Sequence, residues 1–214
     1  MKFYGYFRSS SAYRCRIAFN LKAVTYGFTS VHLRKDGGQQ NHPDYVAMNP
    51  QRLVPTLQSG DVTVGQSLAI IEWLDETQPG PKLLPADPDL RAQVRAFAQI
   101  IACDIHPLQN LRVLQYLGDE FGADQAVKDA WCQRWIADGL GAAEALLAAR
   151  PSAPFCFGET PSLADICLVP QVFSAARFGL DISDLPHIQR VYETCQALPA
   201  FADAAPDKQP DAEG

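Results

Sequence analysis

The chain has 214 residues, of which 47% are hydrophobic, so it can form one large domain or two small ones around a proper core. Its 18 Lys and Arg residues are scattered among 24 Asp and Glu residues and leave a net charge of −6, which argues against a nucleic-acid-binding surface. No apolar run reaches the roughly 18 residues of a membrane span, and the opening MKFYGYFRS lacks the apolar stretch of a signal peptide, so we expect a cytoplasmic protein without a membrane partner.

The first third of the sequence alternates between strand and helix patterns. Residues 2–6 are aromatic and alternating, as in a strand, and residues 11–22 carry apolar side chains about four apart, as in a helix. Further along we expect a strand at 26–33, a loop and a short helical turn near 43–49, a strand from Val54-Pro55, a strand at 62–64 and a helix from about Ser67. The predicted order is βαβαββα.

Pro55 restricts the strand that begins beside it. Proline has no N–H to donate to a ladder, so this position suits an edge strand, the first residues of a strand or a cis turn. In each case the backbone of Val54 is left available for another partner.

A proline-rich segment, 78–89, separates this region from a second half with helical periodicity only. We therefore predict a first domain at 1–80, a linker at 81–88, an all-helical domain at 89–205 and a mobile tail at 206–214. The expected helices are 90–118, 124–149, 162–178 and 186–197. Ser162 and Asp165 fit a capping box at the start of the third helix, and this structural role explains the pair without a catalytic one.

The six cysteines are widely spaced, with no CxxC pair and no Cys/His ligand cluster. This pattern is typical of reduced, buried thiols, and it predicts no metal site.

Eight stretches together resemble the zeta class of soluble glutathione transferases, the class that includes maleylacetoacetate isomerase. They are FRSSSAYRCRIA, KDGGQQ, NPQRLVPTL, QSLAIIEWL, LLPADP, IACDIHPLQNLRVL, FCFGETPSLADICLVPQVFSAARFGLD and KQPD, and they span nearly the whole chain in order. The resemblance implies an α/β domain of the thioredoxin-like type followed by an all-α helical bundle. It also implies a homodimer with glutathione as cofactor.

The serine loop, Ser9-Ser10-Ser11, gains a chemical role from this resemblance. A hydroxyl-rich loop leading into a helix presents free N–H groups and the positive end of the helix dipole, which stabilise an anion such as the thiolate of glutathione. The resemblance makes these three serines the catalytic residues, with Ser9 as the partner of the thiolate. The alternative is that they only cap the helix. Similar proteins usually read Ser-Ser-Cys here, so Ser11 is a departure from the pattern.

The remaining glutathione contacts follow from the resemblance and from the shape of the peptide. Val54, beside Pro55, is expected to pair with the cysteinyl backbone, as extended peptides pair with strand edges. Gln66 and Ser67 are expected to bind the γ-glutamyl carboxylate at a helix N-terminus, with simple capping as the alternative. Gln40 matches a position that reaches the glycine end, although a solvated loop glutamine has the same appearance. The resemblance adds Ser10, Ser11, Arg14, Pro55, His106, Asn110, Leu111 and Arg112 to this set.

Three arginines are candidates for a dianionic substrate, which needs separated cationic groups. They are Arg8 beside the serine loop, Arg112 after HPLQN and Arg177 in QVFSAARFG. A lone arginine is more often a solvated surface residue, and it is their agreement with positions in similar proteins that singles them out. His106 precedes Pro107 and should lie at a bend, where it serves either glutathione or proton transfer, or simply packs.

The implied activity is glutathione-dependent cis–trans isomerisation of 4-maleylacetoacetate to 4-fumarylacetoacetate, a step of tyrosine and phenylalanine breakdown. The bound thiolate adds to the cis double bond and leaves again after rotation about the resulting single bond. Maleylpyruvate isomerisation, general conjugation or dehalogenation by a transferase, and a non-enzymatic role on the same fold remain as alternatives.

Overall fold

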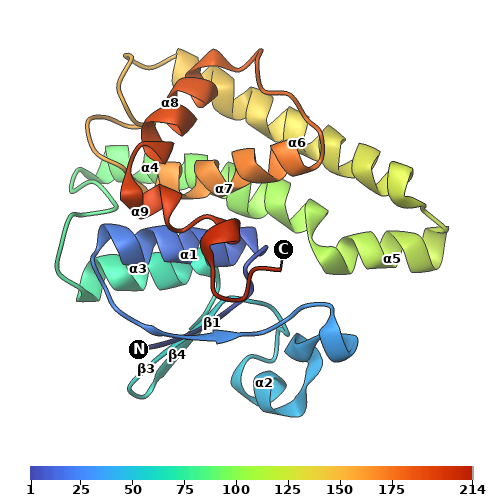
Figure 1. Ribbon diagram of the computed structural model, residues 1–214. Coiled ribbons are helices and arrows are strands. Elements are labelled where there is room, and N and C mark those ends of the chain that lie inside the picture. The colour runs from blue at the N-terminus through green and yellow to red at the C-terminus, as the bar shows by residue number, and fades with distance from the viewer. Residues whose placement is uncertain (214) are drawn as a thin grey trace. The chain divides into compact units, whose positions relative to one another are not determined.

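A four-stranded sheet organises the first of two structural units in this computed structural model, which describes residues 1–213 (Figure 1). This unit comprises Met1–Leu83 and the described residues from Leu198 onward. Its strands and helices, in chain order, are β1 (Lys2–Gly5), α1 (Ser10–Leu21), β2 (Gly27–Ser30), α2 (Pro43–Met48), β3 (Thr56–Ser59), β4 (Val62–Gly65), α3 (Ser67–Thr77) and α9 (Pro199–Ala202). Short 3₁₀ turns lie at Lys35–Gly37, Gln39–Asn41 and Pro206–Lys208. The predicted βαβαββα order is confirmed.

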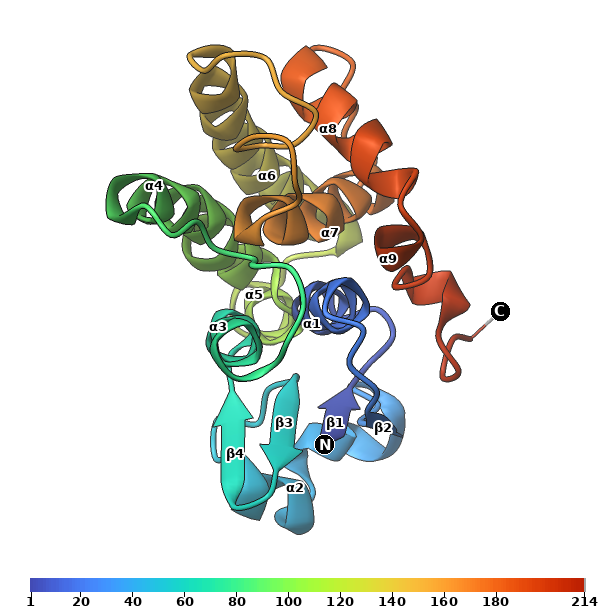
Figure 2. The ribbon, with the colours of Figure 1, turned by 90° about the vertical axis from the view of Figure 1, so that its left-hand side faces the viewer.

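The order of the strands in the sheet is β2-β1-β3-β4, with β1 parallel to β2 and β3 antiparallel to both of its neighbours. Helices α1 and α3 pack against one another on one face of this sheet (Figure 2). The apolar alternation of β1 explains the arrangement, because Phe3 is fully buried and packs edge-on against the ring of Phe19 from α1. Strand β2 is shorter than the predicted 26–33, since only four of its residues find partners on β1.

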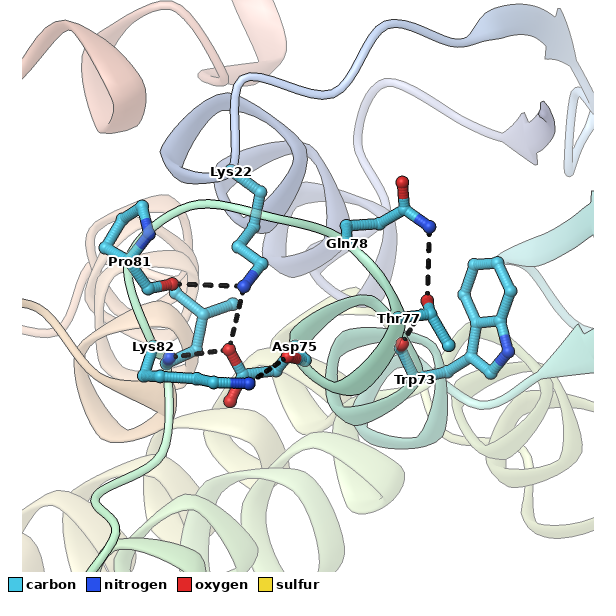
Figure 3. A network of polar contacts seen from close by, with 8 residues as sticks. Lys22, Trp73, Asp75, Thr77, Gln78, Pro81 and Lys82 are labelled. Carbon is cyan, nitrogen blue, oxygen red and sulfur yellow. Dashed lines mark hydrogen bonds and ion pairs between the residues drawn. The ribbon is translucent and has the colours of Figure 1, made fainter.

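A buried ion pair fixes the ends of α1 and α3 (Figure 3). The Lys22 Nζ lies 3.0 Å from the Asp75 Oδ1 and also donates to the Pro81 carbonyl oxygen at 3.1 Å. The same Asp75 oxygen accepts from the Leu83 N–H at 2.9 Å, and Lys82 donates to the Asp75 carbonyl. The first residues of the expected linker are thus bound to the first unit, which divides from the second between Leu83 and Leu84.

The C-terminal segment differs from its expected place. The sequence analysis assigned 198–205 to the helical domain and 206–214 to a mobile tail, whereas the structure groups the described residues from Leu198 onward with the first unit. Helix α9 packs on α1 (Figure 2). The chain beyond it forms a 3₁₀ turn and side-chain hydrogen bonds. The polar composition predicted mobility, but these polar groups have partners far back in the sequence. Gly214 lies outside the described residues.

The second unit, Leu84–Ala197, is helical, as the helical periodicity of this part of the sequence predicted. Its elements are α4 (Pro88–Gln99), a π-helical turn (Ile100–Ile105), a 3₁₀ turn (His106–Gln109), α5 (Leu111–Phe121), α6 (Gln125–Ala148), α7 (Leu163–Arg177) and α8 (Pro186–Gln196). Helix α7 packs against α4 and α8, and α6 packs against α8 (Figure 1). The helices predicted at 124–149, 162–178 and 186–197 are confirmed to within about two residues.

The helix predicted at 90–118 is instead broken into four pieces. A residue before proline usually avoids helical backbone, but His106 keeps helical φ and ψ angles of −57° and −41°, so its backbone does not show the bend that the sequence suggested. The chain instead passes from the π-helical turn into the 3₁₀ turn and leaves the helical conformation at Asn110, whose backbone is extended. A new helix, α5, then begins behind Asn110, whose Oδ1 accepts from the Arg112 N–H at 3.2 Å.

The capping box at the start of α7 is confirmed. The fully buried Asp165 carboxylate accepts from the N–H and hydroxyl of Ser162 and from the N–H of Cys156. Burial raises the pKa of Asp165, and these three donors counteract that effect. Among the described residues, no helix is long and apolar enough to cross a membrane.

Candidate functional site

The register of the sheet gathers four separate chain segments at one of its edges. Thr56 pairs with Tyr4 on one side and with Gly65 on the other, and Gly5 pairs with Ser30. The loop after β1, the segment before β3, the start of α3 after β4 and the loop after β2 therefore all leave the sheet at the same end. These segments contain the serine loop, Val54-Pro55, Gln66-Ser67 and Gln40, so the sheet brings together the candidates that lie in the first unit.

Ser9 is the N-cap of α1. Its backbone is extended, and its Oγ accepts from the Ala12 N–H at 3.2 Å, so the capping role weighed in the sequence analysis is real. A hydroxyl has one donor and two acceptor lone pairs, which leaves the Ser9 O–H able to donate to an anion while it caps the helix. Ser10 and Ser11 occupy the first turn of α1 and are half-buried.

Arg8 is exposed just ahead of this cap. Its guanidinium carbon lies 5.0 Å from the centre of the Phe7 ring, a cation–π contact.

The Val54-Pro55 peptide bond is cis, one of the three possibilities that the sequence left open. Pro55 directly precedes β3, which is an inner strand, so the edge-strand possibility is wrong and the proline removes no ladder hydrogen bond. Within the described residues, the backbone of Val54 has no hydrogen-bond partner. It therefore remains able to pair with an extended peptide.

A buried polar cluster that the sequence analysis missed holds this segment in place. The Leu53 carbonyl oxygen accepts from the Tyr45 hydroxyl at 2.6 Å and from the Asn49 Nδ2 at 2.9 Å, and both side chains also contact the Thr56 hydroxyl at 2.9 Å. Burial raises the pKa of the Tyr45 phenol. The signal available in the sequence was Asn49 before a proline, a pair typical of turns, but its partners could not be read from it.

Helix α3 begins at Ser67, directly after Gln66, whose backbone is strained. Gln66 has a φ of 65°, a region that non-glycine residues seldom adopt and that is concentrated at functional sites. Its side-chain amide donates to the Gln51 Oε1 at 2.9 Å, so it does not cap the helix. The alternative that Gln66 is a simple cap is therefore wrong, and the first N–H groups of α3 lack a side-chain cap from it.

Arg14 brings a buried cation to the same helix start. Its side chain is 1% exposed, and its Nη1 donates to the Ser67 Oγ at 3.3 Å. The Nε and Nη2 atoms are also buried and have no hydrogen-bond partner among the described residues. A buried guanidinium with unused donors is costly unless an anion compensates it. The helix N-terminus and Arg14 together favour a carboxylate at this point.

Gln40 lies in the loop after β2, in the 3₁₀ turn Gln39–Asn41. Its Nε2 donates weakly to the Leu33 carbonyl at 3.4 Å, and its Oε1 is buried with no partner within the described part of the chain. Gln40 is therefore half-buried and not the solvated loop residue that the alternative supposed.

The other candidates lie in the second unit. His106 begins the 3₁₀ turn, Asn110 caps α5, and Leu111 and Arg112 form the first turn of α5. Arg112 is exposed. Arg177 is the last residue of α7, also exposed, with its guanidinium carbon 4.8 Å from the centre of the Phe178 ring.

Models of two domain families match the chain. Residues 3–82 match the N-terminal domain of glutathione S-transferases, and residues 125–194 match their C-terminal domain. The chain belongs to the glutathione S-transferase family. The family predicted from the sequence motifs is therefore confirmed, together with the combination of an α/β domain and a helical domain.

Two curated relatives match this transferase over almost its whole length. A maleylpyruvate isomerase from a Ralstonia species is 51% identical, with 99% of each chain covered. A probable maleylacetoacetate isomerase from Vibrio cholerae is 48% identical, with 98% of this chain and 97% of the relative covered.

Two solved structures share the fold closely. One is a holo maleylpyruvate isomerase described as a bacterial zeta-class transferase, with a TM-score of 0.96 and 50% identity. The other is a maleylacetoacetate isomerase from Methylobacterium extorquens with bound malonate and glutathione, with a TM-score of 0.96 and 39% identity. Each covers 100% of both chains. The predicted zeta-class resemblance is confirmed by these neighbours.

Proposed function

We propose that this transferase is a glutathione-dependent cis–trans isomerase that converts 4-maleylacetoacetate to 4-fumarylacetoacetate. The observation that carries the proposal is the meeting, at one sheet edge, of a serine-capped helix start, an unpaired backbone beside cis-Pro55 and a second helix start with a buried arginine. Relatives that bear isomerase names at 48% and 51% identity support it.

The residues at this edge fit glutathione. The N-terminus of α3, with Gln66, Ser67 and the unused donors of Arg14, suits the γ-glutamyl carboxylate. The Val54 backbone suits the cysteinyl backbone, and the unpartnered Gln40 Oε1 suits an N–H near the glycine end. In the same assignment, His106, Asn110, Leu111 and Arg112 of the second unit are further candidates for glutathione contacts.

When bound, glutathione supplies a thiolate that adds to and leaves from the cis double bond of the substrate, which permits rotation in between. Ser9 keeps this sulfur ionised by donating its O–H, aided by the N–H groups and dipole of α1. A free thiol of this kind has a pKa of about 8.5, so lowering that pKa by about two units requires roughly 2.7 kcal/mol of differential stabilisation. A hydroxyl donor and a helix N-terminus together can provide it.

Arg8, Arg112 and Arg177 are proposed to bind the carboxylates of the substrate. All three are exposed and long enough to form bidentate contacts with a carboxylate. Arg8 directly precedes the serine loop, so it can bind the carboxylate nearest to the reacting carbon. Its charge would also support the enolate-like transition state.

Maleylpyruvate is the second candidate substrate. The same chemistry applies to this shorter dianion, and the relative from Ralstonia that bears this activity in its name is the more similar of the two described above. Net conjugation or dehalogenation remains as a further alternative.

Kinetics with both maleyl substrates, with and without glutathione, test the proposal. We expect trans product with no consumption of glutathione, no turnover in its absence, and a higher kcat/KM for maleylacetoacetate than for maleylpyruvate. The reverse preference would assign the second candidate. Stable glutathione adducts or halide release, without isomerisation, would contradict both.

We also propose that the protein is a cytoplasmic homodimer, as similar transferases suggest. Sedimentation equilibrium at micromolar concentration is the test of assembly. A stable 23.5 kDa species would rule the dimer out.

A further inference from the structure

The backbone of Phe7, two residues before Ser9, is bound by a residue near the other end of the chain. The Phe7 N–H donates to the Asp211 Oδ2 at 3.1 Å, a contact between residues 204 positions apart. The same carboxylate oxygen accepts from the Ser30 hydroxyl at 2.7 Å. Asp211 thus joins the loop after β1 to the end of β2.

The carbonyl of Phe7 is held by a side chain that also contacts the C-terminal part of the chain. It accepts from the Arg16 Nη2 at 3.1 Å, while the Arg16 Nε donates to the Ala204 carbonyl oxygen at 2.9 Å. Arg16 is 1% exposed, and burial lowers its pKa to about 10, which leaves it charged at neutral pH. Both polar groups of the Phe7 backbone are therefore fixed through the C-terminal segment, defined here as residues 198–213.

This segment is itself anchored along α1. The Tyr13 hydroxyl donates to the Phe201 carbonyl at 3.4 Å, and the Asn20 Nδ2 donates to the Ala200 carbonyl at 3.0 Å. Figure 2 shows α9 beside α1, with the chain continuing toward the sheet edge. The segment spans the helix that Ser9 caps and ends at the loop that carries Ser9.

We propose that Asp211 is a positioning residue for the Ser9 hydroxyl. The Ser9 N–H donates to the Tyr6 carbonyl at 3.0 Å, so residues 6–9 form one tight turn, and fixing Phe7 on both sides fixes that turn. A hydrogen bond to an anion weakens steeply with distance and angle, so the turn must be held to within about 0.5 Å to keep the sulfur ionised. This inference rests on the proposed function.

Glu213 adds a weaker contact of the same segment. Its carboxylate pairs with Lys35 and lies 3.2 Å from the His32 Nε2, beside the loop that holds Gln40. The Glu213 and Lys35 side chains are 40% and 61% exposed, and exposed pairs of this kind contribute little. The geometry therefore points to Asp211 and not to Glu213 as the principal contact.

Amide hydrogen exchange of the glutathione-free protein tests the structural half of the inference. In Asp211→Ala we expect exchange across residues 6–9 to accelerate about tenfold or more, because the Phe7 N–H loses its acceptor. Asp211→Asn retains an acceptor oxygen and should stay close to the wild type. Asp207→Ala, an exposed acid in the same segment, is the matched control. Unchanged exchange in Asp211→Ala would overturn the inference.

The pKa of the bound glutathione thiol, read from thiolate absorbance against pH, tests the functional half. Asp211→Ala should raise this pKa by about one unit and lower kcat about threefold near neutral pH, with little change in the KM for glutathione. An effect of charge alone has the opposite sign, because removing an anion near a thiolate lowers the pKa of the thiol. A pKa that falls or stays constant would overturn the inference.

If Asp211→Ala does not fold, Asp211→Glu carries the same test, since it keeps the charge and displaces the carboxylate by one methylene. It should raise the thiol pKa and speed exchange across residues 6–9, and a wild-type result for both would overturn the inference. A wild-type protein that binds no thiolate and isomerises neither substrate would instead overturn the proposed function. In that case, the rate of amide hydrogen exchange at Phe7 would still decide whether Asp211 holds the loop.

Discussion

The Ser9 hydroxyl oxygen accepts a hydrogen bond from the Ala12 N–H at 3.2 Å, so one side chain both caps α1 and presents an O–H at the helix start. Ser9→Ala should therefore reduce kcat far more than Ser10→Ala, about a hundredfold against less than threefold, since only one hydroxyl can lie at hydrogen-bond distance and angle to the sulfur. Loss of the cap should also cost about 1 kcal/mol of stability. Steady-state kinetics and urea unfolding measure the two effects.

Two further variants separate capping from catalysis at this position. Ser9→Gly keeps most of the capping energy but has no hydroxyl, and Ser9→Thr keeps both. We expect Ser9→Gly to be stable and nearly inactive and Ser9→Thr to be active. Unchanged kcat and unchanged thiolate absorbance in Ser9→Gly would refute the assignment of Ser9.

The exposed arginines of the second unit should select the dianionic substrate. Arg177→Ala or Arg112→Ala should weaken the transition-state complex by about 1.5 to 3 kcal/mol, or roughly 10-fold to 150-fold in kcat/KM, through loss of a charge-assisted contact. Glutathione affinity should remain nearly constant in Arg177→Ala, as measured by calorimetry. Arg112 follows Asn110 and Leu111, which are candidates for glutathione contacts, so a parallel loss of glutathione affinity there would move Arg112 to the cofactor side.

The ion pair between Lys22 and Asp75 should dominate the stability of the first unit. Asp75→Ala leaves a buried ammonium without its partner, and we expect it to lower the free energy of unfolding by about 3 to 5 kcal/mol. The double variant Lys22→Met/Asp75→Asn removes both charges and keeps an acceptor for the Leu83 N–H, so it should recover most of the loss. Equal destabilisation of the single and double variants in urea unfolding would show that the charge pairing is not responsible.

Glu144 should make the stability of the helical unit depend on pH. Burial raises its pKa, but hydrogen bonds from the His187 N–H, the Ile188 N–H and the His187 ring outweigh burial, so the net pKa is lowered. This carboxylate of α6 thereby caps the start of α8. Because the folded-state pKa lies below the unfolded value, its stabilisation is present above about pH 4.3 and is lost as the pH falls through the folded pKa.

The measurement for Glu144 is the difference in unfolding free energy between the wild type and Glu144→Ala across a pH series. We expect about 1 kcal/mol near neutral pH, the usual value of a helix cap, shrinking below about pH 4. A difference that grew on acidification would contradict the sign of the pKa shift.

The thiols of the protein should be dispensable for the reaction. Five of the six cysteines are buried and only Cys103 is exposed. Burial raises the pKa of the Cys132 thiol to about 11 and also raises that of Cys156 and Cys195, which slows their alkylation. Iodoacetamide should therefore label Cys103 first, and subsequent addition of glutathione should give nearly full activity.

Ser11→Cys provides the matched variant for this alkylation. It should become alkylated in the first turn of α1 while still isomerising before treatment, because the catalytic sulfur belongs to glutathione. The contrary result would be a loss of activity in the wild-type protein that follows the alkylation of Cys15 and does not occur in Cys15→Ala. That result would show that a protein thiol takes part.

The sequence by itself determined the elements and their local ends. Period-two and period-3.6 apolar patterns predicted the βαβαββα order and three of the later helices, and Ser162 with Asp165 predicted the capping box. These features were predictable because each depends on residues within one or two turns of one another.

Only the tertiary structure decided which distant segments meet. The pairing of Tyr4, Thr56 and Gly65 places the candidate glutathione residues of the first unit at one sheet edge, and this register depends on contacts among strands that are distant in the sequence. The polar C-terminal residues were predicted to be mobile because their composition shows only that they have little apolar surface to bury. Asp211 is ordered instead by hydrogen bonds to Phe7 and Ser30, and partners 204 and 181 positions away leave no local pattern in a sequence.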